Sequence, residues 1–137
     1  MEFALVFGLF VFVLYALIAF GMMLSAKNSL THAAAEGARA AIGVVDDPAT
    51  PLVDERVTAA QTRAYQSLSW LGSKIQLADV SVPAIAHCAS SASPTAMCVT
   101  VNITYPYSTR PLVPPAPGMG LVTPDNLKAT AVVELTT

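Results

Sequence analysis

Charged residues are scarce in this sequence. Its 137 residues include 7 Lys and Arg, 9 Asp and Glu and 2 His, for a formal net charge of −2 at pH 7. The basic residues are scattered along the chain as Lys27, Arg39, Arg56, Arg63, Lys74, Arg110 and Lys128. Because nucleic-acid binding relies on clustered Lys and Arg that contact phosphates, the sequence argues against nucleic acid as a partner.

Residues typical of catalytic and metal sites are also few. The sequence lacks the common motifs of serine hydrolases, zinc proteases, phosphate-binding loops and dinucleotide-binding turns. His87 and Cys88 are adjacent, but neighbouring residues seldom place their side chains for thiol catalysis. We therefore predict no enzyme activity, no metal and no cofactor, and an anchored thiol enzyme is the least favoured alternative.

Only two cysteines are present, Cys88 and Cys98. Their spacing is not that of a CxxC pair, which disfavours a zinc site. An even number of cysteines in a short chain behind an apolar segment fits one disulfide in an oxidising compartment. Such a bridge closes a loop of about 11 residues and stabilises the fold by roughly 2–3 kcal/mol in the chain-entropy estimate. Two free thiols in a reduced domain are the alternative.

Charge is absent from a long run near the beginning of the chain. No charged side chain occurs from Phe3 to Leu24; we call residues 3–24 the apolar segment. As a helix it is roughly 33 Å long, enough to cross the ~30 Å hydrocarbon core of a bilayer. The run is longer than the ~7–15 apolar residues of a signal peptide, and no basic residue precedes it, so we expect it to be retained.

The helical pattern continues beyond the apolar segment. Residues 25–42 are rich in alanine and contain no proline, and Gly43 is a plausible helix stop. The sequence thus predicts one helix from about residue 2 to about residue 42, roughly 60 Å long. We divide the chain into a stem, residues 1–43, and a head, residues 44–137.

The head begins with a second predicted helix. Thr50 and Pro51 suit the N-cap and first helical position, and the helix is expected to end near Gly72. Apolar residues recur at three- and four-residue steps as Val53, Val57, Ala60, Ala64, Leu68 and Leu71. Tyr65 and Trp70 are expected to add to the core contact.

The remainder of the head is predicted to be β. Candidate strands are residues 74–82, 97–105 and 127–135, and the last two alternate apolar and polar residues. Residues 107–125 form a loop that contains Pro111, Pro114, Pro115 and Pro117. The predicted fold class is α+β: a stem helix, a second helix and a small antiparallel sheet of three to four strands.

Two polar side chains lie in or beside the apolar segment. A carboxylate at the border of a membrane helix is costly to bury unless it is paired. Glu2 therefore lies in the headgroup region or finds a positive partner, such as a neighbouring subunit's N-terminal amine. Tyr15 either finds a partner for its hydroxyl or only packs, and packing alone is the favoured interpretation.

Two motifs resemble those of a known family. The start Glu2-Phe3-Ala4-Leu5-Val6, the apolar run after it and the later AAAEGARAA resemble the TadE-like family of pilus assembly proteins. These are minor pseudopilins of the tight-adherence (Flp-type) branch of the type IV pilus machinery. Family members share an EFAL-type start and an AREGAR-like motif, and Ala35 stands here where an arginine is common.

The resemblance implies a pilin-like fold in the bacterial inner membrane, with a cytoplasmic N-terminus and an external head. By charge alone, Lys27 and Arg39 on the head side favour the opposite orientation. The resemblance also implies cleavage after a glycine a few residues before the glutamate. Here Met1 directly precedes Glu2, so either the given chain starts inside a longer precursor or it is not processed.

We therefore expect a membrane-anchored minor pilin-like subunit for assembly of a Tad/Flp-type pilus, retained in the membrane or incorporated in a cell-surface pilus. Its expected partners are other pilin or pseudopilin subunits, the inner-membrane assembly machinery and the lipid bilayer. The candidate assembly residues of the stem are Glu2, Phe3, Gly8, Gly21, Glu36, Gly37 and Arg39. The alternative function is an anchored extracytoplasmic adhesin or binding module that uses residues 112–117.

Overall fold

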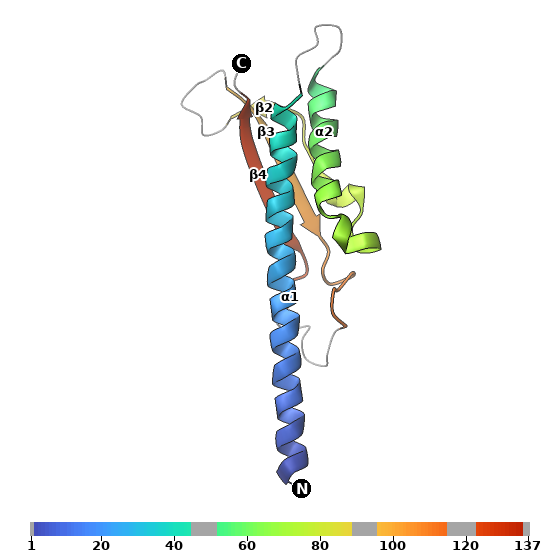
Figure 1. Cartoon of the computed structure of the whole chain (residues 1–137). Helices are drawn as coiled ribbons and strands as arrows, with labels where there is room; N and C mark the ends of the chain where they lie inside the picture. The colour runs from blue at the N-terminus through green and yellow to red at the C-terminus, as the bar shows by residue number, and fades with distance from the viewer. Residues whose placement is uncertain (1, 45–51, 89–95, 115–122, 136–137) are drawn as a thin grey trace.

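The computed structural model of the chain describes residues 2–44, 52–88, 96–114 and 123–135. It has a long N-terminal helix, a second helix, two short 3-10 helices and an antiparallel sheet of 4 strands (Figure 1). The predicted α+β fold class is confirmed.

Helix α1 spans Glu2–Ile42, 41 residues without a proline. Its bounds agree with the prediction. The backbone N–H of Gly43 donates to the carbonyl of Ala40 at 3.2 Å, which closes the last turn before the chain leaves the helix. The apolar segment extends past the sheet and ends at the N-terminus, while the upper half of α1 packs into the head (Figure 1).

Helix α2 spans Leu52–Ser67 and is followed by the 3-10 helix η1, Ser69–Lys74. The predicted N-cap and proline, residues 50–51, lie outside the described residues, as does the side chain of Val53. The later part of the apolar stripe is buried as predicted, at Ala60, Ala64, Leu68 and Leu71.

The prediction for Trp70 was wrong, because its side chain is 55% exposed. Helix α2 ends at Ser67, and the tighter turn of η1 changes the angular step between side chains. Leu71 stays on the buried face, whereas Trp70 turns toward the surface.

The strand predicted over residues 74–82 was mostly wrong. Only Val80–Ser81 pair as a strand there, β1, and Leu77–Asp79 form the 3-10 helix η2. The backbone N–H of Gln76 donates to Asp79 Oδ2 at 2.8 Å. Such local side-chain bonds give the backbone an alternative to a sheet ladder.

Strand β3, Met97–Tyr105, is the centre of the sheet. It pairs along its full length with β4, Leu127–Leu135, from Met97 opposite Leu135 to Tyr105 opposite Leu127. Its other edge pairs with β1 at Ile103 and with the short strand β2, Ala86–His87, at Cys98. The two long strands have the predicted bounds, whereas β2 lies between two candidate strands, where no strand was predicted.

One hydrophobic cluster joins the two helices to the sheet. The alternation in β3 holds, since Val99, Val101 and Ile103 are fully buried and Tyr105 is 1% exposed. From the helices, small side chains dominate the cluster: Ala26, Ala33, Ala34, Ala38, Ala41, Ala60 and Ala64. Small side chains let α1 approach both α2 and the sheet closely.

Candidate functional site

The apolar segment is the most exposed hydrophobic surface of the described residues. Phe3 is 82% exposed and Leu17 is 67% exposed, and exposed large apolar side chains cover most of the helix surface there. Helix α1 is long and apolar enough to cross a membrane. Because water is a poor solvent for such a surface, the segment is consistent with a single-pass membrane anchor.

The predicted assembly residues at the start of the stem lie on this surface. Glu2 is the first residue of α1, and its side chain lies outside the described residues. Phe3 stacks on Phe7 with ring centroids 6.0 Å apart. A Cβ atom added at Gly8 or Gly21 would meet no described atom within 4 Å, so another helix could approach the backbone at both glycines.

Three of the candidate assembly residues, Glu36, Gly37 and Arg39, lie on two faces of the upper stem. Glu36 and Arg39 form an exposed ion pair at 3.3 Å, with side chains 41% and 75% exposed. Solvent screens such a pair, which therefore adds little to stability. Gly37, between them in sequence, is buried against the head. The motif thus combines a polar outer face with an inner contact.

At Gly37 the backbone of the stem packs tightly against the head. An added Cβ atom would lie 2.7 Å from the carbonyl oxygen of Ala60 and 2.8 Å from the Cβ atom of Ala64, both on α2. It would also lie 3.5 Å from a methyl group of Val101 on β3. A residue without a side chain is therefore needed where α1, α2 and the sheet meet.

A second contact lies lower on the stem. The Tyr15 hydroxyl donates a hydrogen bond to the backbone carbonyl of Pro114, in the loop that follows β3. The favoured interpretation, that Tyr15 only packs, was therefore wrong. Among the described side chains of the apolar segment, only one stripe is shielded, formed by Tyr15, Ala16, Ala19 and Met23.

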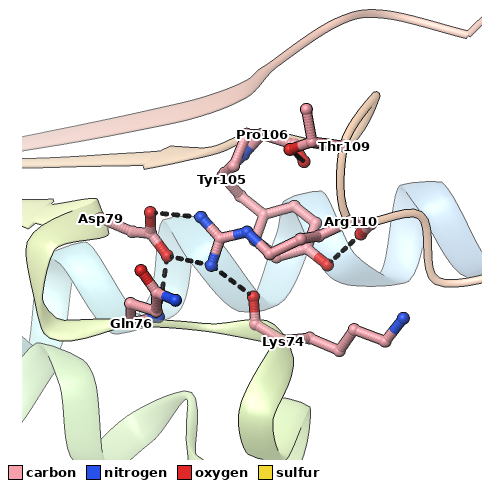
Figure 2. Close-up of polar contacts among 7 residues, drawn as sticks. All are labelled: Lys74, Gln76, Asp79, Tyr105, Pro106, Thr109 and Arg110. Carbon is pink, nitrogen blue, oxygen red and sulfur yellow. Dashed lines mark hydrogen bonds and ion pairs between the residues drawn. The ribbon is translucent and has the colours of Figure 1, made fainter.

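Arg110, at the start of the loop that follows β3, binds residues that precede β1 (Figure 2). Its guanidinium donates to both carboxylate oxygens of Asp79, from Nη1 at 2.9 Å and from Nη2 at 2.7 Å. Nη1 also donates to the carbonyl of Lys74 at 2.8 Å. The guanidinium carbon lies 5.7 Å from the ring centroid of Tyr105, and the Tyr105 hydroxyl donates to the carbonyl of Arg110 at 2.5 Å. We call these four residues the Arg110 cluster.

The charge states of the Arg110 cluster follow from these contacts. The hydrogen bond and charge of Asp79 raise the pKa of Arg110. Burial raises the pKa of the Tyr105 hydroxyl, against the opposing effect of the Arg110 charge. Both groups therefore keep their protons at neutral pH, as the observed donations require.

We predict that Arg110→Met lowers the stability of the chain by about 1–2 kcal/mol, because the Asp79 carboxylate loses its charged partner. The side chains of Arg110 and Asp79 are only 22% and 10% exposed. Arg39→Met is the matched control, since it removes an exposed ion pair and should cost less than about 0.5 kcal/mol. Thermal unfolding in detergent measures both, and equal shifts would contradict the prediction.

Cys88 and Cys98 form a disulfide at the other end of the sheet. The bridge links the end of β2 to β3, with Cα atoms 5.1 Å apart. Both sulfurs are thus engaged, and neither is a thiol nucleophile in this structure. In the part of the chain that the structure describes, no three His, Cys, Asp or Glu side chains gather as a metal site.

The comparison with known families gives a match in the stem. Residues 1–39 match the family model of TadE-like protein. The match begins at the EFAL-type start and ends at Arg39 in the AEGAR motif, so the predicted resemblance is confirmed for the stem. A TadE-like region with an N-terminal apolar helix fits a pilus-associated membrane protein. No curated protein and no solved structure gave a significant match.

The structure separates the predicted site residues into two groups. Phe3, Gly8 and Gly21 are exposed on the apolar segment, and the ion pair of Glu36 and Arg39 is exposed on the upper stem. Gly37 is instead packed into the head. The sequence did not indicate the Arg110 cluster or the contact between Tyr15 and Pro114. Their partners are 31 and 99 residues apart, so no local spacing pattern could have paired them.

Proposed function

We propose that this protein is a minor pilin-like subunit, a pseudopilin, that takes part in the assembly of a Tad/Flp-type pilus. The supporting observation is that the TadE-like match coincides with helix α1. The apolar segment of this helix is exposed, and its other half packs into a small head. This arrangement leaves the lower stem available to lipid or to other stems. The expected location is the bacterial inner membrane, with the head outside the cytoplasm.

Assembly in this proposal is an exchange of contacts along the stem. In the bilayer the exposed side chains of the apolar segment contact lipid tails. On association, the open backbone at Gly8 and Gly21 allows a neighbouring stem to approach closely, and dispersion contacts between helices replace contacts with lipid. The proposed partners are other pilin or pseudopilin subunits and the inner-membrane assembly machinery.

Glu2 is the residue whose replacement tests this proposal most directly. We expect Glu2→Gln to reduce co-purification of partner pilins about tenfold or more. The reason is the loss of a charged hydrogen bond between Glu2 and a neighbouring subunit's N-terminal amine, worth about 1.5–3 kcal/mol. The measurement is quantitative co-purification from detergent-solubilised membranes, together with a count of surface pili. Glu55→Gln, an exposed change on α2, is the matched control and should leave both unchanged. Normal pili and normal co-purification with Glu2→Gln would count against the proposal.

The adhesin alternative relies on the proline-rich loop. The described part of this loop lies beside the stem, where Pro114 accepts the hydrogen bond from Tyr15. It thus faces the apolar segment, away from the free end of the head (Figure 1). The contact between Pro114 and Tyr15 does not favour a ligand-binding role for the loop.

A further inference from the structure

We propose that Pro111–Pro114 enter the leaflet on the head side of the bilayer, and that Trp70 lies at the surface of that leaflet. The ligand is the lipid itself: acyl chains around the loop and headgroups around the rim of the head. This inference requires only that the apolar segment spans a membrane, and it is independent of a role in pilus assembly.

The depth of the loop follows from its contact with Tyr15. Tyr15 lies nine residues before Leu24, the last residue of the charge-free run, which is roughly 14 Å along a helix axis. Half of a typical hydrocarbon core is about 15 Å thick. Because the Tyr15 hydroxyl donates to the Pro114 carbonyl, Pro114 lies well below the leaflet surface if the apolar segment spans the bilayer.

The chemistry of the loop suits hydrocarbon. No charged side chain occurs from Pro111 to Pro124. An unpaired backbone N–H or carbonyl in lipid costs several kcal/mol, and proline has no N–H to satisfy. The carbonyls of Pro111 and Pro114 also have partners: Lys74 Nζ donates to Pro111 at 3.1 Å, and Tyr15 donates to Pro114. Leu112 packs against the core cluster.

The groups above the loop suit the lipid headgroups. Lys74 and Trp70 belong to η1, and Trp70 is 55% exposed. In Figure 1 this yellow-green segment lies at the end of the head nearest the apolar segment. Trp is enriched at membrane surfaces, where its ring is partly apolar and its N–H stays hydrated. Lysine at that depth is attracted to anionic headgroups.

Fluorescence quenching by brominated lipids tests the proposal in the full chain. Trp70 is the only tryptophan, so Trp70→Phe gives a background in which a new tryptophan reports one position. We expect Val113→Trp in this background to be quenched several-fold more strongly by acyl-chain bromines than Val132→Trp. Val132 is the matched control because it is 60% exposed on the outer face of β4. The vesicles contain phosphatidylcholine and phosphatidylglycerol.

Equal quenching of the two variants by lipid bromines would overturn the proposal. So would equal quenching by aqueous acrylamide, because a tryptophan within the leaflet is protected from it. A Val113→Trp signal that both quenchers leave unaffected would place the loop against protein and would also overturn it. The unaltered chain gives a second measurement that needs no substitution. There Trp70 should be quenched more by bromine near the headgroup end of the acyl chain than near its methyl end, and no quenching at either position would contradict the proposed docking.

Discussion

Gly37→Leu is expected to lower the melting temperature of the chain by roughly 12–24 °C, which corresponds to about 3 kcal/mol for a domain of this size. Its first side-chain carbon would already lie 2.7 Å from the Ala60 carbonyl oxygen and 2.8 Å from the Ala64 Cβ atom. Both neighbours are close to the α2 backbone and cannot rotate away. Helix α2 must therefore move off α1, which also opens the contact of the stem with Val101.

The expected loss exceeds any gain in helix propensity. Replacing Gly with a good helix former stabilises an exposed helix interior by up to about 1 kcal/mol. A lower melting temperature for Gly37→Leu would therefore be due to the clash with α2. Gly43→Leu is the matched control because the nearest described atom to its added Cβ is the Ala40 carbonyl oxygen at 3.6 Å, an ordinary contact. Near-ultraviolet circular dichroism in detergent measures the thermal unfolding of the head. Equal melting temperatures for the two leucine variants would show that the contact at Gly37 is not tight.

Local patterns predicted the main elements of the fold. The stem helix could be predicted because its signal is composition over 41 residues rather than any single residue. Strands β3 and β4 could be predicted because one face of each is buried, which fixes a period of two in the sequence. A register shift by one residue would expose Val99, Val101 and Ile103 to solvent, so the pattern and the pairing agree.

The failures are at positions where contacts distant in sequence or local polar bonds decide. Residues 74–82 have a plausible strand composition, but the bond from Gln76 to Asp79 and the ion pair from Asp79 to Arg110 hold a 3-10 turn there. Trp70 continues the apolar pattern of the predicted helix, but the turn of η1 carries its side chain to the surface. Strand β2 has only two residues, too few for any periodicity.

The candidate site could be predicted from the resemblance to a family, but not from residue spacing or helix propensity. Gly37 stands out in the sequence only as a small cost to a helix, and its reason becomes visible when Ala60 and Ala64 are placed against it. Spacing on α2 predicted that these two alanines face inward, but not that they face Gly37. The TadE-like match to residues 1–39 marks the position without explaining it.

Replacing both Cys88 and Cys98 with serine is expected to lower stability by about 2–3 kcal/mol, or roughly 8–24 °C in melting temperature. The bridge joins residues 10 positions apart and fastens β2 to β3. Among the described residues, β2 pairs with β3 at Ala86 with Cys98 and at His87 with Met97. Without the bridge, β2 has two exposed residues and little buried surface to hold it on the sheet.

A reductant separates this effect from the cost of the serine side chains. Reducing the unaltered chain in detergent should reproduce most of the shift, because it removes the same constraint on the unfolded chain without changing the sequence. The double serine variant should melt at the same temperature with and without the reductant. Ser67→Ala is the background control, because its hydroxyl donates to the Arg63 carbonyl on an exposed face of α2 and its loss should cost little. If the unaltered chain resisted unfolding equally well after complete reduction, packing of β2 rather than the bridge would hold this edge of the sheet.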